Sequence, residues 1–216
     1  GRFLVASVMF NDQSVQTKIW RTNDWSEVPL QRFIGEHSFF HDLSPDDALL
    51  AAGYTDGTVR LWKFPSGQLV VTFRQQKARN CELRFSPDGR QLAYSTYGKN
   101  QDLWICDLVR GTTRKVTTGG RAAYFSWSPD GRWIAFSYSE GGTSGLYRIK
   151  TDGSGPAEHL MQSEEVCFYV SDYLKDGTSL LFTECSPEGD WDIWVYDLQT
   201  RQRRQVLDSA SEEVFP

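Results

Sequence analysis

Short runs rich in apolar and β-branched residues alternate with clusters of turn-forming residues along the whole chain. In residues 78–119, four such runs fall at 80–85, 91–97, 102–108 and 112–118. Runs of this length and composition are typical of strands. No stretch shows sustained apolar spacing of 3.6 residues between helix caps. The pattern therefore predicts an all-β chain built from groups of four strands, which we call a, b, c and d in chain order.

The b and d strands of these groups differ in polarity. The b strands are almost continuously apolar, at 3–8, 48–54, 133–138 and 179–185, as expected of strands that are buried on both faces. The d strands are polar and charged, as in TTRKVTT at 112–118. Sheets with buried inner strands and a solvent-exposed outer strand are typical of four-stranded antiparallel blades that stack face to face around an axis.

Two markers repeat in phase and give the number of blades. The first marker is Ser-Pro-Asp at 44–46, 86–88 and 128–130, with Leu-Lys-Asp at 174–176 as a degenerate copy. The second is an aromatic residue after leucine or isoleucine: Trp20, Trp62, Trp104, Tyr147 and Trp194. A fixed period of this length is the signature of a repeat array. We predict five repeats, at about 1–35, 36–77, 78–119, 120–163 and 164–210, followed by a further strand at 212–216.

The first marker also predicts a turn between strands a and b. Pro87 presets φ near −65° at the first turn position, and Gly89 supplies the left-handed conformation that closes the hairpin. Gly131 and Gly177 occupy the matching place, and Asp47 replaces the glycine in the second repeat. We expect all four residues to adopt positive φ, which glycine does freely and aspartate tolerates.

Several of these segments resemble a known family. The sequences at 85–108, 125–160 and 192–207 are similar to the WD-like repeats of TolB-type β-propellers, and prolyl oligopeptidases and tricorn-type proteases carry similar blades. The second repeat, at 43–73, is closer to a true WD repeat, although Lys63 replaces the aspartate of its Trp-Asp pair. The resemblance covers almost the whole chain and implies a β-propeller. It leaves function open, because this repeat serves binding, scaffolding and enzyme-gating proteins alike.

The two ends of the chain fall at the same phase of the repeat. Gly1 aligns with the glycine of the a–b turn, and the final EEVFP matches the a strand at 122–126. We expect the chain to be part of a larger propeller. The alternative is a closed five-blade ring in which the strand at 212–216 completes the first blade.

Composition narrows the classes of function. The net charge of −5 and the pI near 5.3 argue against general nucleic-acid binding, which uses a strongly basic face. No apolar run approaches 18 residues, so we expect no membrane insertion by this segment. The sequence has no G-x-S-x-G, no H-E-x-x-H and no glycine-rich loop between a strand and a helix. We therefore predict a non-enzymatic chain with no cofactor and no metal.

The positions of the four cysteines give no clear prediction of a disulfide. Cys81 and Cys106 fall on strands a and c of one sheet, about 9–10 Å apart, which is beyond disulfide reach. Cys167 and Cys185 fall on neighbouring strands and could approach one another. The simplest interpretation is four buried thiols that behave as small hydrophobic groups.

The loops offer the best candidate site. In propellers the b–c and d–a loops emerge on one face, around the mouth of the central channel, and variable loops on a rigid frame commonly carry function. Basic residues from adjacent repeats and acidic residues from the next two predict a mouth with a basic arc beside an acidic arc. We expect this face to bind a protein or peptide; the alternative is the substrate-gating propeller of a prolyl-oligopeptidase-like or tricorn-like peptidase. The candidate binding residues are His37, Lys77, Arg79, Arg121, Glu164, Glu165, Asp190 and Trp191.

Overall fold

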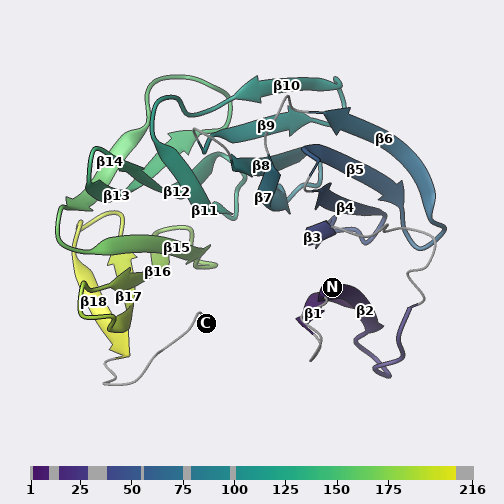
Figure 1. The fold of residues 1–216 in the computed structure, drawn as a ribbon, viewed down its shortest axis with the longest axis horizontal. Helices are drawn as coiled ribbons and strands as arrows, with labels where there is room; N and C mark the ends of the chain where they lie inside the picture. Colours follow the sequence, from purple (N-terminus) through teal and green to yellow (C-terminus); the bar gives the residue numbers. More distant parts are fainter. Residues whose placement is uncertain are drawn as a thin grey trace. The chain divides into compact units, whose positions relative to one another are not determined.

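The computed structural model describes residues 2–9, 15–28, 38–54, 56–74, 79–97 and 101–207. These residues form eighteen β-strands and contain no helix (Figure 1). The chain divides into two compact bodies. The N-terminal body comprises residues 1–99 and 103–115, and the C-terminal body comprises residues 100–102 and 116–216.

The N-terminal body contains three antiparallel sheets, in each of which neighbouring strands follow chain order. The first sheet pairs β1 (Phe3–Met9) with β2 (Val15–Arg21), and an isolated bridge joins Trp20 to Glu27. The second consists of β3 (Ser38–Leu43), β4 (Leu49–Tyr54), β5 (Thr58–Lys63) and β6 (Gln68–Arg74). The third consists of β7 (Arg79–Phe85), β8 (Gln91–Tyr97), β9 (Leu103–Asp107) and β10 (Thr112–Lys115).

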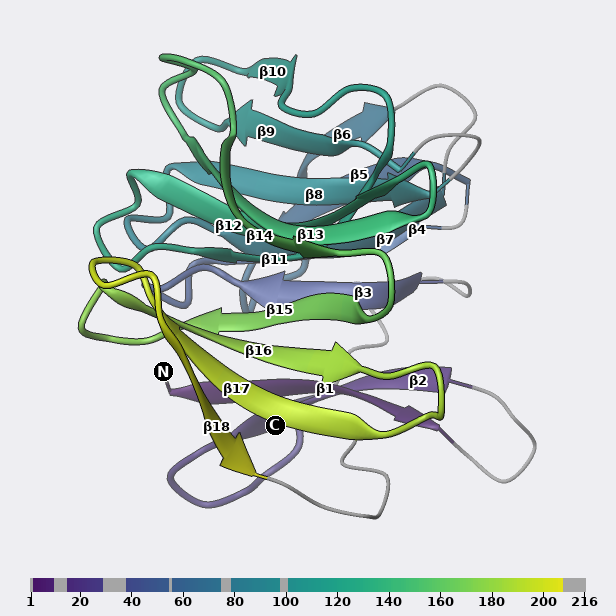
Figure 2. The same ribbon diagram turned by 90° about the vertical axis from the view of Figure 1, so that its left-hand side faces the viewer.

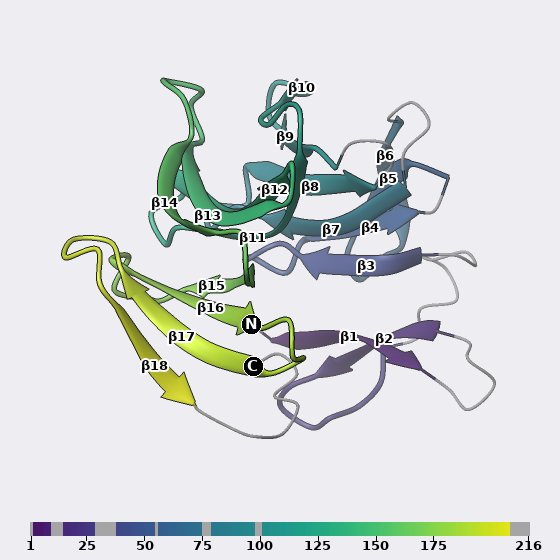
Figure 3. The same cartoon turned by 60° about the vertical axis from the view of Figure 1, so that its left-hand side comes forward.

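The C-terminal body contains two four-stranded antiparallel sheets of the same topology. One consists of β11 (Arg121–Trp127), β12 (Trp133–Glu140), β13 (Thr143–Lys150) and β14 (Glu158–Ser163). The other consists of β15 (Cys167–Tyr173), β16 (Ser179–Cys185), β17 (Trp191–Asp197) and β18 (Arg203–Leu207). Figure 2 shows β15 to β18 in this order, and Figure 3 shows the four strands from β11 to β14.

The five sheets confirm the predicted all-β fold of five repeats. The aromatic marker lies on strand c of every sheet, directly opposite a large apolar residue of strand b. These pairs are Leu4 with Trp20, Leu50 with Trp62, Tyr94 with Trp104, Phe136 with Tyr147 and Phe182 with Trp194. Cross-strand pairs of this kind stabilise antiparallel sheets. The second marker therefore repeats because each sheet has a large side chain on strand c opposite the apolar residue of strand b.

In the four-stranded sheets, the b strands are more buried than the outer d strands. Leu50, Leu92, Ile134 and Leu180 on the b strands are fully buried, whereas β10 and β18 are largely exposed. The outer strand β6 departs from the expected polarity, because Leu69 and Val70 are 52% and 50% exposed. The remaining outer strands described here carry charged residues, which protect an open edge from pairing with other chains.

The Ser-Pro-Asp marker is explained by the turn between strands a and b. In the third repeat Ser86 Oγ donates to Asp88 Oδ1 at 2.6 Å and accepts from the backbone N of Gln91 at 2.9 Å. The Ser86 hydroxyl and the backbone N–H of Arg90 stabilise the carboxylate, so they lower the pKa of Asp88. The serine and the aspartate thus form a hydrogen-bonded clasp that starts strand b in the correct register.

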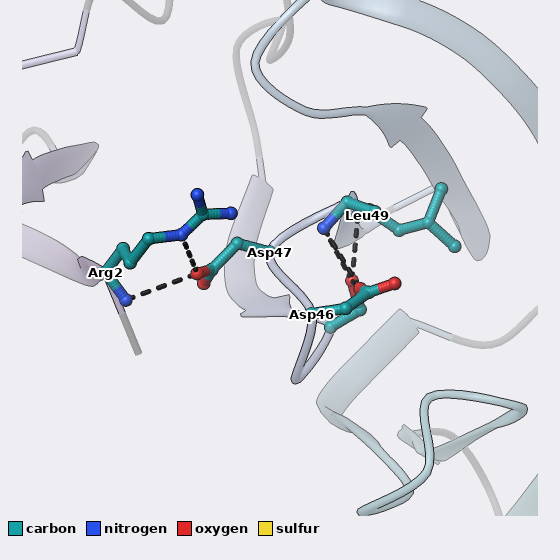
Figure 4. Close-up of polar contacts among 6 residues, drawn as sticks. Arg2, Asp46, Asp47 and Leu49 are labelled. Atoms are coloured by element: carbon teal, nitrogen blue, oxygen red, sulfur yellow. Dashed lines mark hydrogen bonds and ion pairs between the residues drawn. The ribbon is translucent and has the colours of Figure 1, made fainter.

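The same clasp closes the a–b hairpins of the second and fourth repeats. In the second repeat Ser44 Oγ donates to Asp46 Oδ1 at 2.6 Å and accepts from the backbone N of Leu49 at 2.8 Å. Figure 4 shows this turn together with a separate contact, in which Arg2 Nε donates to Asp47 Oδ2 at 3.1 Å. As predicted, the closing residues have positive φ: 58° at Asp47, 69° at Gly89, 70° at Gly131 and 68° at Gly177. The degenerate fourth copy keeps its aspartate, and the hydroxyl of Ser179 donates to Asp176 Oδ2 at 2.9 Å instead.

Within each body, the a strand of one sheet packs on the preceding sheet. β7 contacts β3, β4 and β5, and β15 contacts β11, β12 and β13. In the C-terminal body Ser126 Oγ donates to Asp172 Oδ1 at 2.6 Å and accepts from the backbone N of Tyr173 at 3.1 Å. The end of β15 thus meets the end of β11. At the other end, the backbone N of Phe168 donates to Oγ of Ser144, which is level with Arg121 at the start of β11, so the two strands run in the same direction.

Candidate functional site

The b–c and d–a loops of the C-terminal body meet at one end of its sheets. Cys167, Cys185 and Trp191 stand directly opposite one another on β15, β16 and β17. The start of β15, the end of β16 and the start of β17 therefore lie at the same end. Since β11 and β15 run in the same direction, the start of β11 lies at this end too. We call this region the loop end of the C-terminal body.

Three aromatic rings from three strands contact one another in a row near this end. The rings of Tyr169 and Trp191 are stacked, with centroids 5.4 Å apart and planes at 18°. The ring of Tyr124 meets Tyr169 edge to face, at 4.8 Å and 79°. Both geometries are favourable for aromatic pairs. We call Tyr124, Tyr169 and Trp191 the aromatic ladder.

Tyr124 adopts an unusual backbone conformation. It lies at a β-bulge between Ala123 and Phe125, with φ at 49°, and its residue surface is 41% exposed. Positive φ in a bulky residue costs of order 1 kcal/mol or more, and such residues cluster at functional sites. The bulge directs the Tyr124 ring towards β15 of the next sheet, where it contacts Tyr169.

Tyr169, at the centre of the aromatic ladder, carries a neutral hydroxyl group at neutral pH. Burial, followed by the charge of Cys167, raises the pKa of Tyr169 to about 12. Its hydroxyl therefore stays protonated throughout the physiological range. The stack presents aromatic surface together with a neutral hydroxyl group.

Two short turns hold acidic residues beside the aromatic ladder. Ser163 Oγ accepts from the backbone N of Glu165 at 3.0 Å, which shapes the turn that carries Glu164 and Glu165 into β15. The loop before β17 is closed by Ser186, whose Oγ accepts from the backbone N of Asp190 at 3.2 Å. The three acidic side chains are exposed. Three carboxylates at neighbouring turns make this part of the loop end electronegative.

Arg121 adds one cation at the start of β11. Its Nε donates to Gln101 Oε1 at 3.0 Å, and the backbone N of Ala122 donates to Gln101 O at 2.7 Å. Arg121 is largely exposed. Nearby, the hydroxyl of Tyr138 accepts from the backbone N of Gly120 at 2.7 Å, which fixes the loop that leads into β11.

The structure places five of the eight predicted site residues at the loop end of the C-terminal body. They are Arg121, Glu164, Glu165, Asp190 and Trp191. Arg79 begins β7 in the N-terminal body, and its side chain is not described. His37 and Lys77 lie outside the described residues. The basic arc beside an acidic arc thus stays a prediction.

Sequence reasoning missed Tyr124 and Tyr169 as members of the site. Tyr169 carries a weak signal, because it stands two residues after Cys167 and so shares a strand face with it. Tyr124 carries none, since its position depends on a bulge that no local pattern marks. The interpretation of all four cysteines as buried thiols is also wrong: Cys106 is buried, but Cys167 is exposed at the start of its strand.

Neither a cluster of metal-ligating side chains nor a membrane-spanning helix is found in the described ranges. Over these residues, no group of three or more His, Cys, Asp or Glu side chains is placed to hold a metal ion. The same ranges contain no helix with the length and hydrophobicity needed to cross a membrane.

Repeated four-stranded antiparallel sheets, with β7 and β15 each packed on the preceding sheet of their own body, are typical of a β-propeller. The model of the TolB beta propeller domain matches residues 54–216 of this chain. The chain therefore belongs to the TolB beta propeller domain family. The model of the WD domain, G-beta repeat, matches residues 28–63, which agrees with the more WD-like character of the second repeat.

Similar proteins support this assignment. An uncharacterized protein of Agrobacterium fabrum is 30% identical over 173 residues, which are 78% of this chain and 54% of that protein. Dipeptidyl-peptidase 5 of Porphyromonas gingivalis is 27% identical over 140 residues, 58% of this chain and 20% of the peptidase. The solved structure of a putative TolB from Agrobacterium tumefaciens has a TM-score of 0.71 at 21% identity, over 95% of this chain and 80% of that one.

The chain spans only part of these curated relatives. It covers about half the length of the Agrobacterium fabrum protein and about a fifth of the peptidase. The likeness to the solved TolB structure concerns the fold alone.

Proposed function

We propose that this chain is a non-enzymatic interaction module that binds a peptide segment of a partner protein at the loop end of the C-terminal body. The aromatic ladder is the observation that supports this function. Tyrosine and tryptophan supply large contact area at low conformational cost and are enriched among the residues that dominate interface energetics. The 41% exposure of Tyr124 leaves aromatic surface available to a partner.

The charges around the aromatic ladder favour a basic partner segment. Glu164, Glu165 and Asp190 are exposed at the two turns that flank Trp191, and Arg121 is the cation at the start of β11. A lysine or arginine side chain in the peptide would meet carboxylates and aromatic faces together. A cation over an aromatic ring contributes about 0.5–2 kcal/mol, depending on how far it is desolvated.

A peptide-binding assay tests this function without a known partner. The probes are fluorescein-labelled 12-residue peptides of equal length that contain either lysine and aromatic residues or glutamate and aromatic residues, titrated at physiological salt. We expect the basic peptides to bind at least about tenfold more tightly than the acidic ones. Equal and weak binding of both sets would contradict the proposal.

A matched pair of variants locates the binding surface. Trp191→Ala should weaken binding of the basic peptide by about tenfold or more, as truncation of an aromatic interface residue does. Trp25→Ala is the control, because Trp25 is 65% exposed on the turn after β2, in the N-terminal body. If both variants bind like the unmodified chain, the peptide binds elsewhere.

The second candidate function is the substrate-gating propeller of a peptidase. It is supported by the 27% identity to dipeptidyl-peptidase 5 of Porphyromonas gingivalis. In this case the catalytic groups would belong to residues outside the present sequence. The full-length reading frame distinguishes the two functions: an α/β-hydrolase domain with a nucleophile elbow favours gating, and Trp191→Ala should then change kcat/KM for peptide substrates.

A further inference from the structure

Two free cysteines face each other across β15 and β16. Cys167 and Cys185 are directly opposed in the antiparallel register, and neither forms a disulfide. Directly opposed residues in such a pair have Cα atoms about 4.5–5.5 Å apart and point to the same face of the sheet. Disulfides need Cα separations of about 4.4–6.8 Å. The backbone therefore already holds the two thiols at a distance that a disulfide can bridge.

The pair is also accessible to small molecules. Cys167 is exposed at the first position of β15, and Cys185 is half-buried at the last position of β16. Cys106, in contrast, is fully buried within the N-terminal body. Among these three described thiols, Cys167 is the one that an external oxidant reaches first.

We propose that Cys167 and Cys185 form a reversible thiol–disulfide site that takes a low-molecular-weight disulfide, such as oxidised glutathione, as its co-reactant. The Cys167 thiolate attacks one sulfur of oxidised glutathione, forms a mixed disulfide and releases one glutathione thiolate. The Cys185 thiol then loses its proton, and its sulfur attacks Cys167 Sγ and displaces the second glutathione. Two protein thiols are oxidised and one glutathione disulfide is reduced to two thiols; excess reduced glutathione reverses both steps.

The different surroundings of the two thiols agree with this order of events. Burial, together with the neighbouring Cys167, raises the pKa of the Cys185 thiol, so less of Cys185 than of an ordinary cysteine is present as thiolate at neutral pH. Once Cys167 carries glutathione, Cys185 is well placed to attack the mixed disulfide, because it lies directly opposite Cys167 on the neighbouring strand. Exposed disulfides at such sites are more easily reduced than buried structural ones.

The thiol pair adjoins the aromatic ladder. Trp191 stands directly opposite Cys185 on β17, and Tyr169 lies two residues after Cys167. This site goes beyond the proposed peptide binding and does not depend on it, because disulfide formation needs only the two cysteines.

Peptide mapping tests the proposal directly. Trypsin cleaves after Lys150, Lys175 and Arg201, so Cys167 and Cys185 fall on separate peptides, 151–175 and 176–201. The folded chain is incubated with oxidised glutathione at pH 7.5, blocked with iodoacetamide and digested. We expect the two peptides to be recovered as one disulfide-linked species, two hydrogen masses below their sum, and as separate peptides after dithiothreitol. Recovery of both as alkylated peptides, or as glutathione adducts only, would overturn the proposal.

Three variants distinguish a built pair from indiscriminate oxidation. Cys185→Ser should leave Cys167 as a stable glutathione adduct, whereas Cys167→Ser should slow modification of Cys185 by about tenfold or more. Cys106→Ala is the control and should form the 167–185 link at the unmodified rate. If the link forms only in urea, or if cysteines pair at random, the folded register does not direct the reaction and the proposal fails.

Discussion

The carboxylate of Asp42 on β3 accepts a hydrogen bond of 2.7 Å from the backbone N–H of Phe85, at the end of β7 in the next sheet. Ser126 occupies the equivalent place in the C-terminal body and accepts from the backbone N of Tyr173 at 3.1 Å. An aspartate and a serine thus satisfy the same backbone donor of the following blade. The two sheets of each pair are tied together by this bond as well as by their apolar faces.

The first prediction concerns pH and the neighbouring pair His41 and Asp42. Burial raises the pKa of Asp42 from 3.8 to about 6 and lowers the pKa of His41 from 6.5 to about 4. For Asp42 the folded state binds more protons, so stability is lost as pH rises from about 4 to 6. For His41 the unfolded state binds more protons, so stability is gained as pH rises from about 4 to 6.5. The two effects oppose each other in the unmodified chain.

Separating the pair should expose both slopes. As pH rises from 4 to 6, the His41→Gln variant should become less stable, because only the Asp42 effect remains. Over the same range the Asp42→Asn variant should become more stable, and its amide oxygen can still accept from the backbone N of Phe85. Each slope is at most about 1.4 kcal/mol per pH unit. Urea unfolding at pH 4, 5, 6 and 7 measures this. Parallel profiles for the two variants would show that neither group titrates as described.

The second prediction concerns the hydroxyl in the a–b turn. Ser86→Ala removes the acceptor of the Gln91 N–H and the donor to Asp88, in a place where Ser86 is buried. We expect a loss of about 1–3 kcal/mol in the free energy of unfolding, because a buried donor is left without its partner. Ser66→Ala is the control, because the Ser66 hydroxyl lies on an exposed turn, where it donates to the backbone O of Lys63 at 3.3 Å. Equal midpoints for the two variants in urea would contradict this account of the motif.

The third prediction concerns the residue that closes the turn. Gly131 has φ at 70°, a conformation in which a β-branched side chain is strained. Gly131→Val should therefore lower the free energy of unfolding by more than about 1 kcal/mol. Arg132→Val is the control: Arg132 is the next residue and is exposed, so this variant should change the free energy of unfolding by less than half as much. A thermal melt of Gly131→Val that matches the unmodified chain would count against the prediction.

The fourth prediction concerns charge at the loop end of the C-terminal body, and it rests on the proposed peptide binding. Arg121→Glu replaces the cation at the start of β11 with a further carboxylate. Basic peptides should then bind about two- to fivefold more tightly at low salt, and the gain should shrink at higher ionic strength, because rim charges act mainly through steering. Arg132→Glu, at the opposite end of the same sheet, is the control. Unchanged affinity and salt dependence for Arg121→Glu would place the binding surface elsewhere.

The repeated architecture could be predicted because its causes are local. The clasp needs Ser86 and Asp88 at fixed spacing, and the closing turn needs a residue that tolerates positive φ, so both leave a pattern in the sequence. The fifth repeat shows the limit of such patterns. Its turn looked degenerate, yet Ser179 supplies the hydroxyl from the other side of the turn.

The candidate site could be predicted only in part. Trp191 and its acidic neighbours were found because loop positions follow directly from the strand pattern. Tyr124 was not found, because its contact with Tyr169 depends on a bulge and on the packing of one sheet on the next. The exposure of Cys167 was missed for a related reason: an apolar residue at the first position of a strand reads as interior, although the strand end is open to solvent.

The a–b clasp makes each hairpin self-sufficient. Its hydrogen bonds in the third repeat all connect groups between Ser86 and Gln91, so no partner from another repeat is required to set the strand register. A segment of about 42 residues copied by gene duplication would carry these instructions with it. The loops at the far end of the same strands take no part in the clasp, so they can diverge after duplication without loss of the blade. New binding specificities can therefore evolve in one blade at a time.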